Sequence, residues 1–265
     1  MEVDQFIVEV IFYSLLLIFL TVQVFRLVLF KDFQLFYDLQ IQFHGLMLIF
    51  AVARIAVSCI SYSANKKILL IFIVKRIAYL SFFTSFTLLL FFWAKISNGI
   101  QYHEKTPKSL KIPLLITNAI FYLFAIISII IFATDVEKPE YSNGFYQINS
   151  IIVAAAFLVV SISFLVYGLI LIRKLKIIVG LIANRKKFLI KSFFVTLFVS
   201  ICFLLKFIMF VYHPITDKNM NSWFFLFFAY FIPELLPSIT QSIVMGPQVP
   251  NKNEEVKWKL MNNEN

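Results

Sequence analysis

Residues 148–172 read INSIIVAAAFLVVSISFLVYGLILI, a stretch of 25 residues without a charged side chain. At 1.5 Å per residue a helix of this length covers about 37 Å, whereas the hydrocarbon core of a bilayer is about 30 Å thick. Because lipid offers no hydrogen-bond partner to a bare peptide group, only helices and closed barrels span membranes. The stretch shows no strict alternation of apolar and polar residues, so it predicts a membrane-spanning helix.

Six further runs have the same character. In chain order the seven runs are 6–25, 41–62, 68–93, 112–132, 148–172, 188–212 and 222–244. The composition agrees, because 61% hydrophobic residues and a mean hydropathy of +0.88 describe a chain that would aggregate in water. We therefore predict an all-α protein, a seven-transmembrane helix bundle formed by residues 1–245, followed by a polar tail, 246–265.

The distribution of positive charge predicts the orientation, since Lys and Arg in short loops are retained in the cytoplasm. Of the 24 Lys and Arg residues, sixteen lie on the side that holds loops one, three and five and the C-terminus, four lie on the other side, and four lie inside runs. We expect the N-terminus to be outside or lumenal and the C-terminus, with its tail, to be cytosolic. The net charge of +10 is then mostly a topology signal that faces anionic lipids, and it does not imply nucleic-acid binding.

The fifth loop has basic residues on both sides of an apolar centre. They are Arg173, Lys174, Lys176, Arg185, Lys186 and Lys187. One interpretation is that they flank two helices that extend a turn or two beyond the membrane. The other is that they form a basic cytosolic surface that holds anionic lipids or an acidic face of a cytosolic partner.

Ionisable residues inside the runs predict an intramembrane charge network, because a charge in a span costs about 2.5–3.5 kcal/mol without a partner. Arg54 lies eight residues before the outer end of the second run, and Glu234 lies twelve residues after the outer end of the seventh. The depth difference of about 6 Å is within reach of a long arginine side chain if these helices are neighbours. Lys206 in the sixth run is a competing partner for Glu234. The network is a structural salt bridge, a site for ligand or ion coupling, or a solvent contact.

Other features of the spans carry smaller predictions. Pro233 and Pro237 interrupt the seventh run and predict a kink there. Lys75 and Arg76 lie seven and eight residues into the third run, where we expect them to reach toward the outer interface.

The sequence offers little chemistry. His44 and His103 belong to the predicted cytosolic half and His213 to the opposite surface, so they cannot form a three-histidine zinc site. No Gly-rich phosphate loop and no nucleophile with a nearby base are present. We expect no enzyme activity, no cofactor and no metal.

Seven helices with an external N-terminus resemble the plan of G-protein-coupled receptors, but the signatures of the rhodopsin-like group are missing. Helix three ends in Phe91, Phe92, Trp93, Ala94 and Lys95, without an acidic-Arg-aromatic triplet, and helix seven has no Asn-Pro-x-x-Tyr.

The chain more closely resembles the tobamovirus multiplication protein family, a seven-helix group with animal relatives among lysosomal orphan receptors. The motifs that carry the resemblance, in order, are Phe43-His44 with Arg54 ten residues on, Leu90 to Lys95, Asn118 to Tyr122, Tyr167-Gly168 with Arg173-Lys174, Arg185 to Lys187, Phe203 to Lys206, and Glu234 to Ser238. Lys95 and Lys206 depart from the pattern, which has an acidic residue and an arginine at these positions.

The resemblance implies a membrane scaffold of endosomal, vacuolar or lysosomal membranes that recruits an ARF-like small GTPase. A ligand-responsive orphan receptor at the plasma membrane is the second hypothesis. A small-solute transporter is the third, and the lack of an internal repeat argues against it.

Overall fold

The computed structural model describes residues 3–29, 37–63, 68–99, 108–135, 139–178, 183–216 and 221–246, and its regular structure there is helical. Within these ranges, the structure does not describe the side chains of residues 37, 93–99, 108–111, 113–114, 135, 139–146, 167, 171–172, 174–178, 183–193 and 213–214. The elements are α1 (Val3–Leu29), α2 (Tyr37–Tyr62), α3 (Ile68–Gly99), α4 (Lys108–Asp135), α5 (Pro139–Ile178), α6 (Ala183–Thr216), α7 (Ser222–Phe225), η3 (Leu226–Leu235) and α8 (Leu236–Val244).

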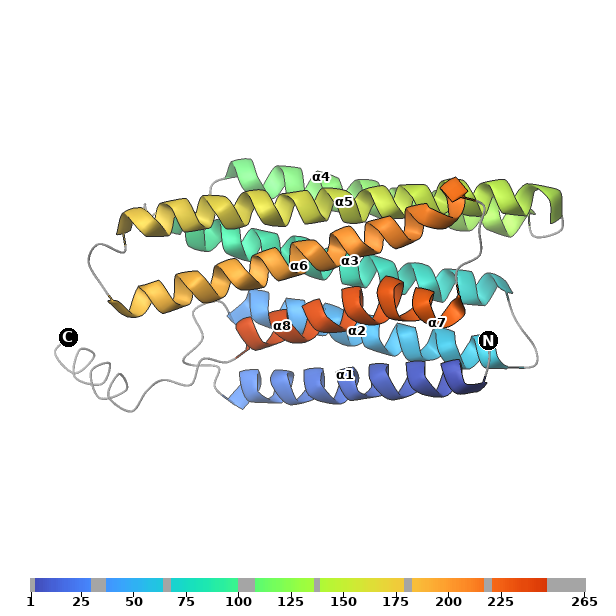
Figure 1. Cartoon of the computed structure of the whole chain (residues 1–265), viewed down its shortest axis with the longest axis horizontal. Coiled ribbons are helices and arrows are strands. Elements are labelled where there is room, and N and C mark those ends of the chain that lie inside the picture. Colours follow the sequence, from blue (N-terminus) through green and yellow to red (C-terminus); the bar gives the residue numbers. More distant parts are fainter. Residues whose placement is uncertain are drawn as a thin grey trace.

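Seven helical rods in the described ranges are long and apolar enough to cross a membrane, with α7, η3 and α8 together forming the last. They run up and down along the long axis of the molecule (Figure 1). We call the end at which α1 begins the N-terminal end, and the other the opposite end. The prediction of an all-α, seven-span architecture is confirmed, while the orientation in the membrane stays a prediction. Of the predicted tail, 246–265, only Gly246 belongs to the described residues.

Most helices extend beyond the apolar runs that predicted them. The largest extension is in α5, which begins at Pro139 and ends at Ile178, so that only 179–182 separate it from α6. Polar helix ends can continue past the hydrocarbon because water satisfies their last backbone groups. Much of the predicted fifth loop is therefore helix.

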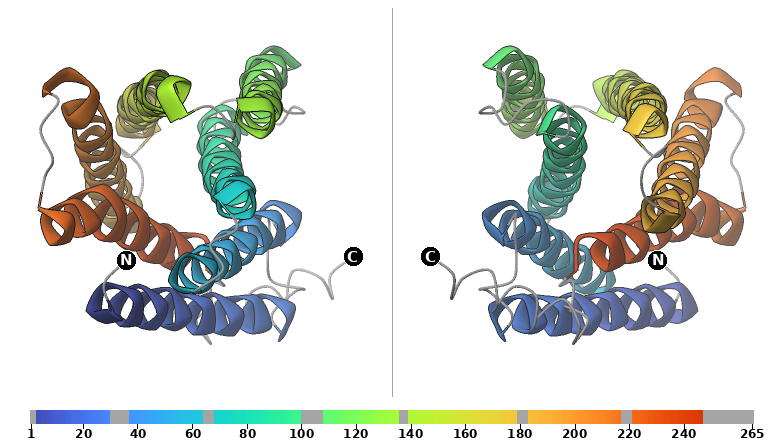
Figure 2. Two further views of the ribbon diagram at one scale, coloured as in Figure 1. Left: turned by 90° about the vertical axis from the view of Figure 1, so that its right-hand side faces the viewer. Right: turned by 90° about the vertical axis from the view of Figure 1, so that its left-hand side faces the viewer.

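Packing between helices is uneven. The end-on views show the rods arranged around a common axis, with α1 and α4 at the periphery (Figure 2). The α5–α6 pair has the most extensive packing, α2 packs between α1 and α3, and α6 packs against η3. In contrast, α4 packs mainly against α3 and barely touches α5. This leaves the face between α4 and α5 loosely closed.

The core is rich in aromatic rings, and the exposed apolar residues are mostly aliphatic. Phe50, Phe82, Phe86 and Phe203 are almost fully buried near the centre of the bundle. Large apolar residues stay exposed along the outer faces, as on α4. An exposed apolar surface of this extent is stable only where the surrounding solvent is lipid.

The seventh rod changes helix type in its middle. Residues Leu226–Leu235 form a π-helix that contains Pro233 and continues into α8, near whose start Pro237 lies. In an α-helix the ring of Pro233 would collide with the carbonyl of Ala229, four residues earlier, and the wider turn relieves that collision. π-Helical turns are frequent at functional sites.

The α5–α6 contact is close because it uses small residues. Gly168 in α5 lies against the methyl group of Thr196 in α6. Ser161 lies two turns from Gly168, and Ser200 lies one turn from Thr196. Ser161 Oγ donates a hydrogen bond to the Ser200 carbonyl (2.8 Å), and Ser200 Oγ donates one to the Ser161 carbonyl (3.0 Å). Small side chains and interhelical hydrogen bonds are the usual means of joining helices in lipid.

Candidate functional site

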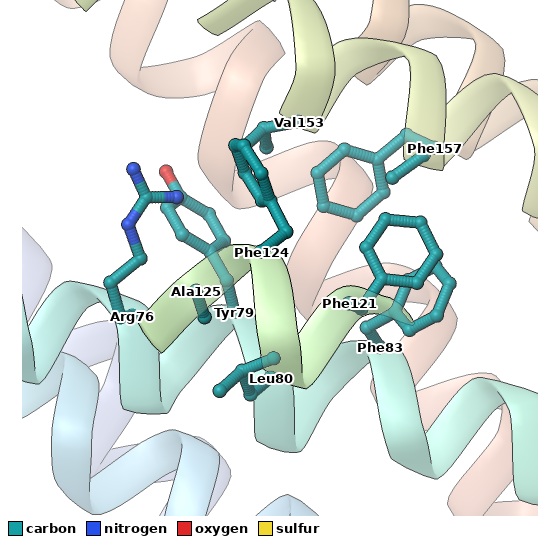
Figure 3. Close-up of a pocket in the computed structure, with 10 residues that line it drawn as sticks. Arg76, Tyr79, Leu80, Phe83, Phe121, Phe124, Ala125, Val153 and Phe157 are labelled. Carbon is teal, nitrogen blue, oxygen red and sulfur yellow. The ribbon is translucent and has the colours of Figure 1, made fainter. Parts of the chain in front are cut away.

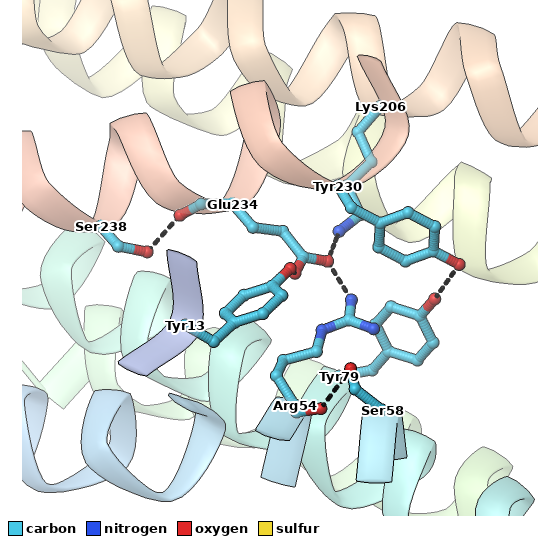
Figure 4. Close-up of polar contacts among 8 residues, drawn as sticks. All are labelled: Tyr13, Arg54, Ser58, Tyr79, Lys206, Tyr230, Glu234 and Ser238. Carbon is cyan, nitrogen blue, oxygen red and sulfur yellow. Dashed lines mark hydrogen bonds and ion pairs between the residues drawn. The ribbon is translucent and has the colours of Figure 1, made fainter. Parts of the chain in front are cut away.

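A buried carboxylate lies where four helices meet. Glu234 in η3 is fully buried, and its Oε1 forms ion pairs with the Arg54 guanidinium of α2 and the Lys206 ammonium of α6. Its Oε2 accepts a hydrogen bond of 2.7 Å from the Tyr13 hydroxyl of α1 (Figure 4). We call Tyr13, Arg54, Lys206 and Glu234 the charge centre. The structure thus brings together the three residues predicted as an intramembrane charge network.

Side chains alone make this connection between the second and seventh rods. The backbones of α2 and η3 have little close contact, so the long Arg54 side chain crosses the space between them. The π-helix contributes as well, because Ser238 Oγ donates a hydrogen bond to the Glu234 carbonyl.

Aromatic rings enclose both cations. The Arg54 Cζ lies 4.7 Å from the centre of the Tyr230 ring and 5.0 Å from that of Tyr79, and the two tyrosine hydroxyls are 3.4 Å apart. The Lys206 Nζ lies 4.6 Å from the centre of the Phe157 ring. Cation–π attraction at a desolvated site contributes about 2 kcal/mol, and therefore compensates part of the cost of burying these charges.

The charge centre holds two cations against one carboxylate, a formal charge of +1. A further carboxylate among the described residues, the half-buried Glu9, accepts a hydrogen bond from Ser58 Oγ. Ser58 Oγ also lies 3.2 Å from the Arg54 carbonyl. The Nε of Arg54 has no hydrogen-bond partner there. Glu234 is consequently the component whose loss leaves most charge uncompensated.

The described residues form no group of three His, Cys, Asp or Glu side chains that could hold a metal ion. The contacts of the charge centre are electrostatic. They join α1, α2, α6 and η3 through the single carboxylate of Glu234. Broken buried pairs cost about 3–5 kcal/mol, so the centre favours one arrangement of these four helices.

The remaining predicted residues have different outcomes. Pro233 and Pro237 are both buried in the seventh rod. Arg173 is exposed near the end of α5. The side chains of the other predicted basic residues lie outside those described: Lys174, Lys176, Arg185, Lys186 and Lys187.

The side chain of Arg76 is buried, and its reach toward the outer interface stays a prediction. Its side chain is only 5% exposed, its Nη2 donates a hydrogen bond to Asn149 Oδ1 of α5, and its Cζ lies 4.6 Å from the Phe72 ring centre. Lys75 is half-buried.

Sequence reasoning missed the tyrosines of the site. Tyr13 lies ten residues from Val3, the residue at which α1 begins at the N-terminal end of the bundle. Arg54 lies eight residues from Tyr62, the residue at which α2 ends at the same end, so the two side chains have similar depth. A tyrosine at the depth of a buried arginine was a usable signal, because a buried hydroxyl requires a polar partner.

Comparison with protein families finds a match to a model described as the THH1/TOM1/TOM3 domain, over residues 2–260. Neither the curated proteins nor the solved structures gave a match.

Proposed function

Because the chain belongs to the THH1/TOM1/TOM3 family, the tobamovirus multiplication protein family that its motifs resemble, we propose that this integral multi-pass membrane protein is a receptor-like scaffold for a cytosolic partner. The partner would bind the basic residues at the end of α5 and the start of α6. An ARF-like small GTPase is the partner class we propose, on an endosomal, vacuolar or lysosomal membrane.

The observation that carries the proposal is the position of two basic helix ends. Between the end of α5 and the start of α6 lie only residues 179–182, and these two helices have the most extensive packing in the bundle. Two clusters of three cationic residues are therefore attached to adjacent helix ends, at the opposite end of the bundle (Figure 1). Positive charge concentrated in this way favours an acidic protein face and accelerates its association.

In this proposal the charge centre has a supporting role. It joins four helices, including α6, which continues from the basic cluster at its start to Lys206. A fixed arrangement of these helices presents the two clusters in a constant geometry, which reduces the ordering cost of binding.

Proximity labelling from a ligase fused after residue 265 tests the proposal in cells. We expect wild-type protein to label a small GTPase of the ARF-like class, and a variant with Arg185→Glu, Lys186→Glu and Lys187→Glu to lose that label. The matched control is Lys66→Glu with Lys67→Glu, which reverses charge at the other predicted side and should leave the labelling unchanged.

Two results would contradict the proposal. Equal labelling of the small GTPase by the loop-five variant and the wild type would exclude the basic surface as its binding site. Labelling dominated by lumenal proteins would show that the orientation is inverted. Membrane fractionation of each variant checks that an altered label does not come from misplaced protein.

A further inference from the structure

A group of buried polar side chains lies between α2 and α8, near the opposite end of the bundle (Figure 1). Gln40 and His44 come from the start of α2, and Gln241 and Ser242 come from the end of α8. We call these four residues the polar cluster. None of them is more than 5% exposed. Because buried polar side chains are almost always hydrogen-bonded, each of them requires a partner.

Five atoms of the polar cluster have no hydrogen-bond partner among the described residues. They are Gln40 Oε1, His44 Nε2, Gln241 Oε1, Gln241 Nε2 and Ser242 Oγ. The described residues contain only two other buried side-chain atoms of this kind, so the unpaired atoms are concentrated at one place. Folding removes the bulk water to which each atom would otherwise bond, so five atoms without any partner would be strongly destabilising.

The side chains of the polar cluster face one another across the two helices. The His44 ring lies close to the Ser242 carbonyl, and its Nδ1 lies 2.8 Å from the Gln40 carbonyl oxygen. Helix α1 adjoins the group, because a Cβ added at Gly246 would lie 3.0 Å from both Gln23 Oε1 and the Ser242 carbonyl oxygen. The unpaired atoms therefore lie at the junction of α1, α2 and α8.

The space between α2 and α8 is suited to small molecules. The backbones of these two helices have little close contact, although their polar side chains are buried together. On α8 the buried side chains at two successive turns are the short ones of Ser238 and Ser242. Short side chains between helices that do not pack closely leave gaps, and polar gaps inside proteins hold ordered water.

The space beside Arg76, between α3, α4 and α5, is a contrasting case (Figure 3). It has a volume of about 40 Å³, but its walls are almost entirely apolar, with Phe83 and Phe121 among them. Apolar cavities stay dry, because a water molecule there would lose its hydrogen bonds. Polar partners, rather than room alone, thus decide where water binds inside the bundle.

From these observations we infer that the polar cluster is a buried water-binding site, at which about two ordered water molecules bridge α2 and α8. A bound water makes about three hydrogen bonds, so about two waters satisfy the five unpaired atoms. The mixture of donors and acceptors favours water over an ion. A cation would leave the Gln241 amide nitrogen unpaired, and an anion would repel the Gln40 and Gln241 amide oxygens.

The waters attach the seventh rod to α2 at a second depth. Gln241 lies seven residues from Glu234, about 10 Å along the rod and on the same face. The link from Glu234 to Arg54 is a direct ion pair, whereas the link at Gln241 passes through water. A water bridge is nearly as strong as a direct hydrogen bond, so the rod is held to α2 in both halves of the bundle. This site is separate from the basic helix ends on which the proposed function rests.

X-ray radiolytic labelling of the full-length protein in phosphatidylcholine nanodiscs tests the inference. A bound water releases hydroxyl radical where it lies, so it oxidises adjacent side chains that bulk solvent does not reach. The readout is the oxidation rate of His44, divided by its rate in the denatured chain. The control is Phe83, which lines the apolar space beside Arg76 and is slightly more exposed than His44. We expect the normalised rate of His44 to exceed that of Phe83 at least about fivefold, and equal rates would overturn the inference.

A variant of α8 with a matched control locates the water. Ser242→Val replaces the hydroxyl of the site with methyl groups that occupy the place of a water. Its control Thr240→Val removes an exposed hydroxyl that bonds to the Leu236 carbonyl of its own helix. We expect the His44 rate to fall at least about threefold in Ser242→Val and to stay within about twofold of the wild type in the control. An unchanged His44 rate in Ser242→Val would contradict the site.

The sign of a change in melting temperature decides independently. Gln241→Leu replaces the amide with an apolar group of similar volume. If water binds the amide, the variant deprives that water of two partners, and the melting temperature should fall by about 2–4 °C. A rise or no change would overturn the inference, because removing an amide that has no partner removes a penalty. If Ser242→Val fails to fold, Gln241→Leu and the wild-type rates of His44 and Phe83 still decide.

Discussion

Replacing Glu234 should destabilise the protein far more than replacing Lys206, although the two residues form one ion pair. The charge centre has a formal charge of +1 with both cations and Glu234 present. Glu234→Gln raises that charge to +2 and leaves Arg54 and Lys206 close together without a counter-ion. Lys206→Met, a change of similar volume, lowers the charge to zero and leaves the Arg54–Glu234 pair intact.

The magnitudes follow from burial. Breaking a buried pair so that a charge is left unpaired costs about 3–5 kcal/mol. Lys206→Met leaves no charge unpaired, because Arg54 and Glu234 still neutralise each other. For a chain of this size, 3–5 kcal/mol corresponds to a fall of about 6–20 °C in melting temperature. We expect that fall for Glu234→Gln and a change of less than about 4 °C for Lys206→Met. The double variant should recover part of the loss, because it restores a charge of +1.

Thermal melting of purified protein, followed by fluorescence-detected size exclusion in one detergent, measures all three variants. The reasoning would be refuted by a Glu234→Gln variant that melts like the wild type, or by a Lys206→Met variant that falls as far as Glu234→Gln. Failure of the double variant to recover stability would show that the two side chains are not coupled.

Three further predictions use the same melting assay. Tyr13→Phe should lower the free energy of unfolding by about 1.5–3 kcal/mol, because it removes the hydrogen bond to the Glu234 carboxylate. Its control Tyr62→Phe, at the exposed end of α2, should leave the free energy of unfolding almost unchanged. Equal effects of the two variants would contradict the hydrogen bond. Gly168→Ala should destabilise the protein by about 1–3 kcal/mol, because the added methyl group would overlap Thr196. Its control Gly45→Ala has no neighbour within 4 Å and should stabilise α2 by about 0.5–1 kcal/mol. A stability change of the same sign for both variants would exclude the close α5–α6 approach. Ser161→Ala and Ser200→Ala should each destabilise the protein by about 0.6 kcal/mol, since each serine donates its own hydrogen bond. The two losses of stability should add in the double variant. A loss in only one of the single variants would show that the two hydrogen bonds are not reciprocal.

Hydropathy and charge patterns predicted the number and order of the helices, because in lipid a run such as 148–172 has almost no alternative to a helix. The depth argument also identified which charges could meet: Arg54 and Glu234 differ by about 6 Å along their helices, and the Arg54 side chain covers that distance. Lys206 was expected to compete with Arg54 for Glu234, but one carboxylate oxygen accepts both cations.

Features that depend on side-chain direction were not accessible from the sequence. Tyr13, Tyr79 and Tyr230 are three of eleven tyrosines, and only the rotation of each helix decides which of them faces a charge. The partner of Arg76 was not predicted for the same reason, since Asn149 comes from a helix whose rotation the sequence does not reveal. The loose packing of α4 against α5 was not predicted either, because hydropathy does not report how closely two helices pack.

The π-helix at Leu226–Leu235 makes the seventh rod sensitive to insertions and deletions. A π turn is equivalent to one extra residue in an α-helix, and one residue corresponds to about 100° of rotation. A homologue that lost a single residue here could retain its hydropathy profile and both prolines, yet its carboxylate would point away from its cationic partners. Gaps placed in this segment of an alignment are therefore better indicators of a disabled protein than most substitutions elsewhere in the chain.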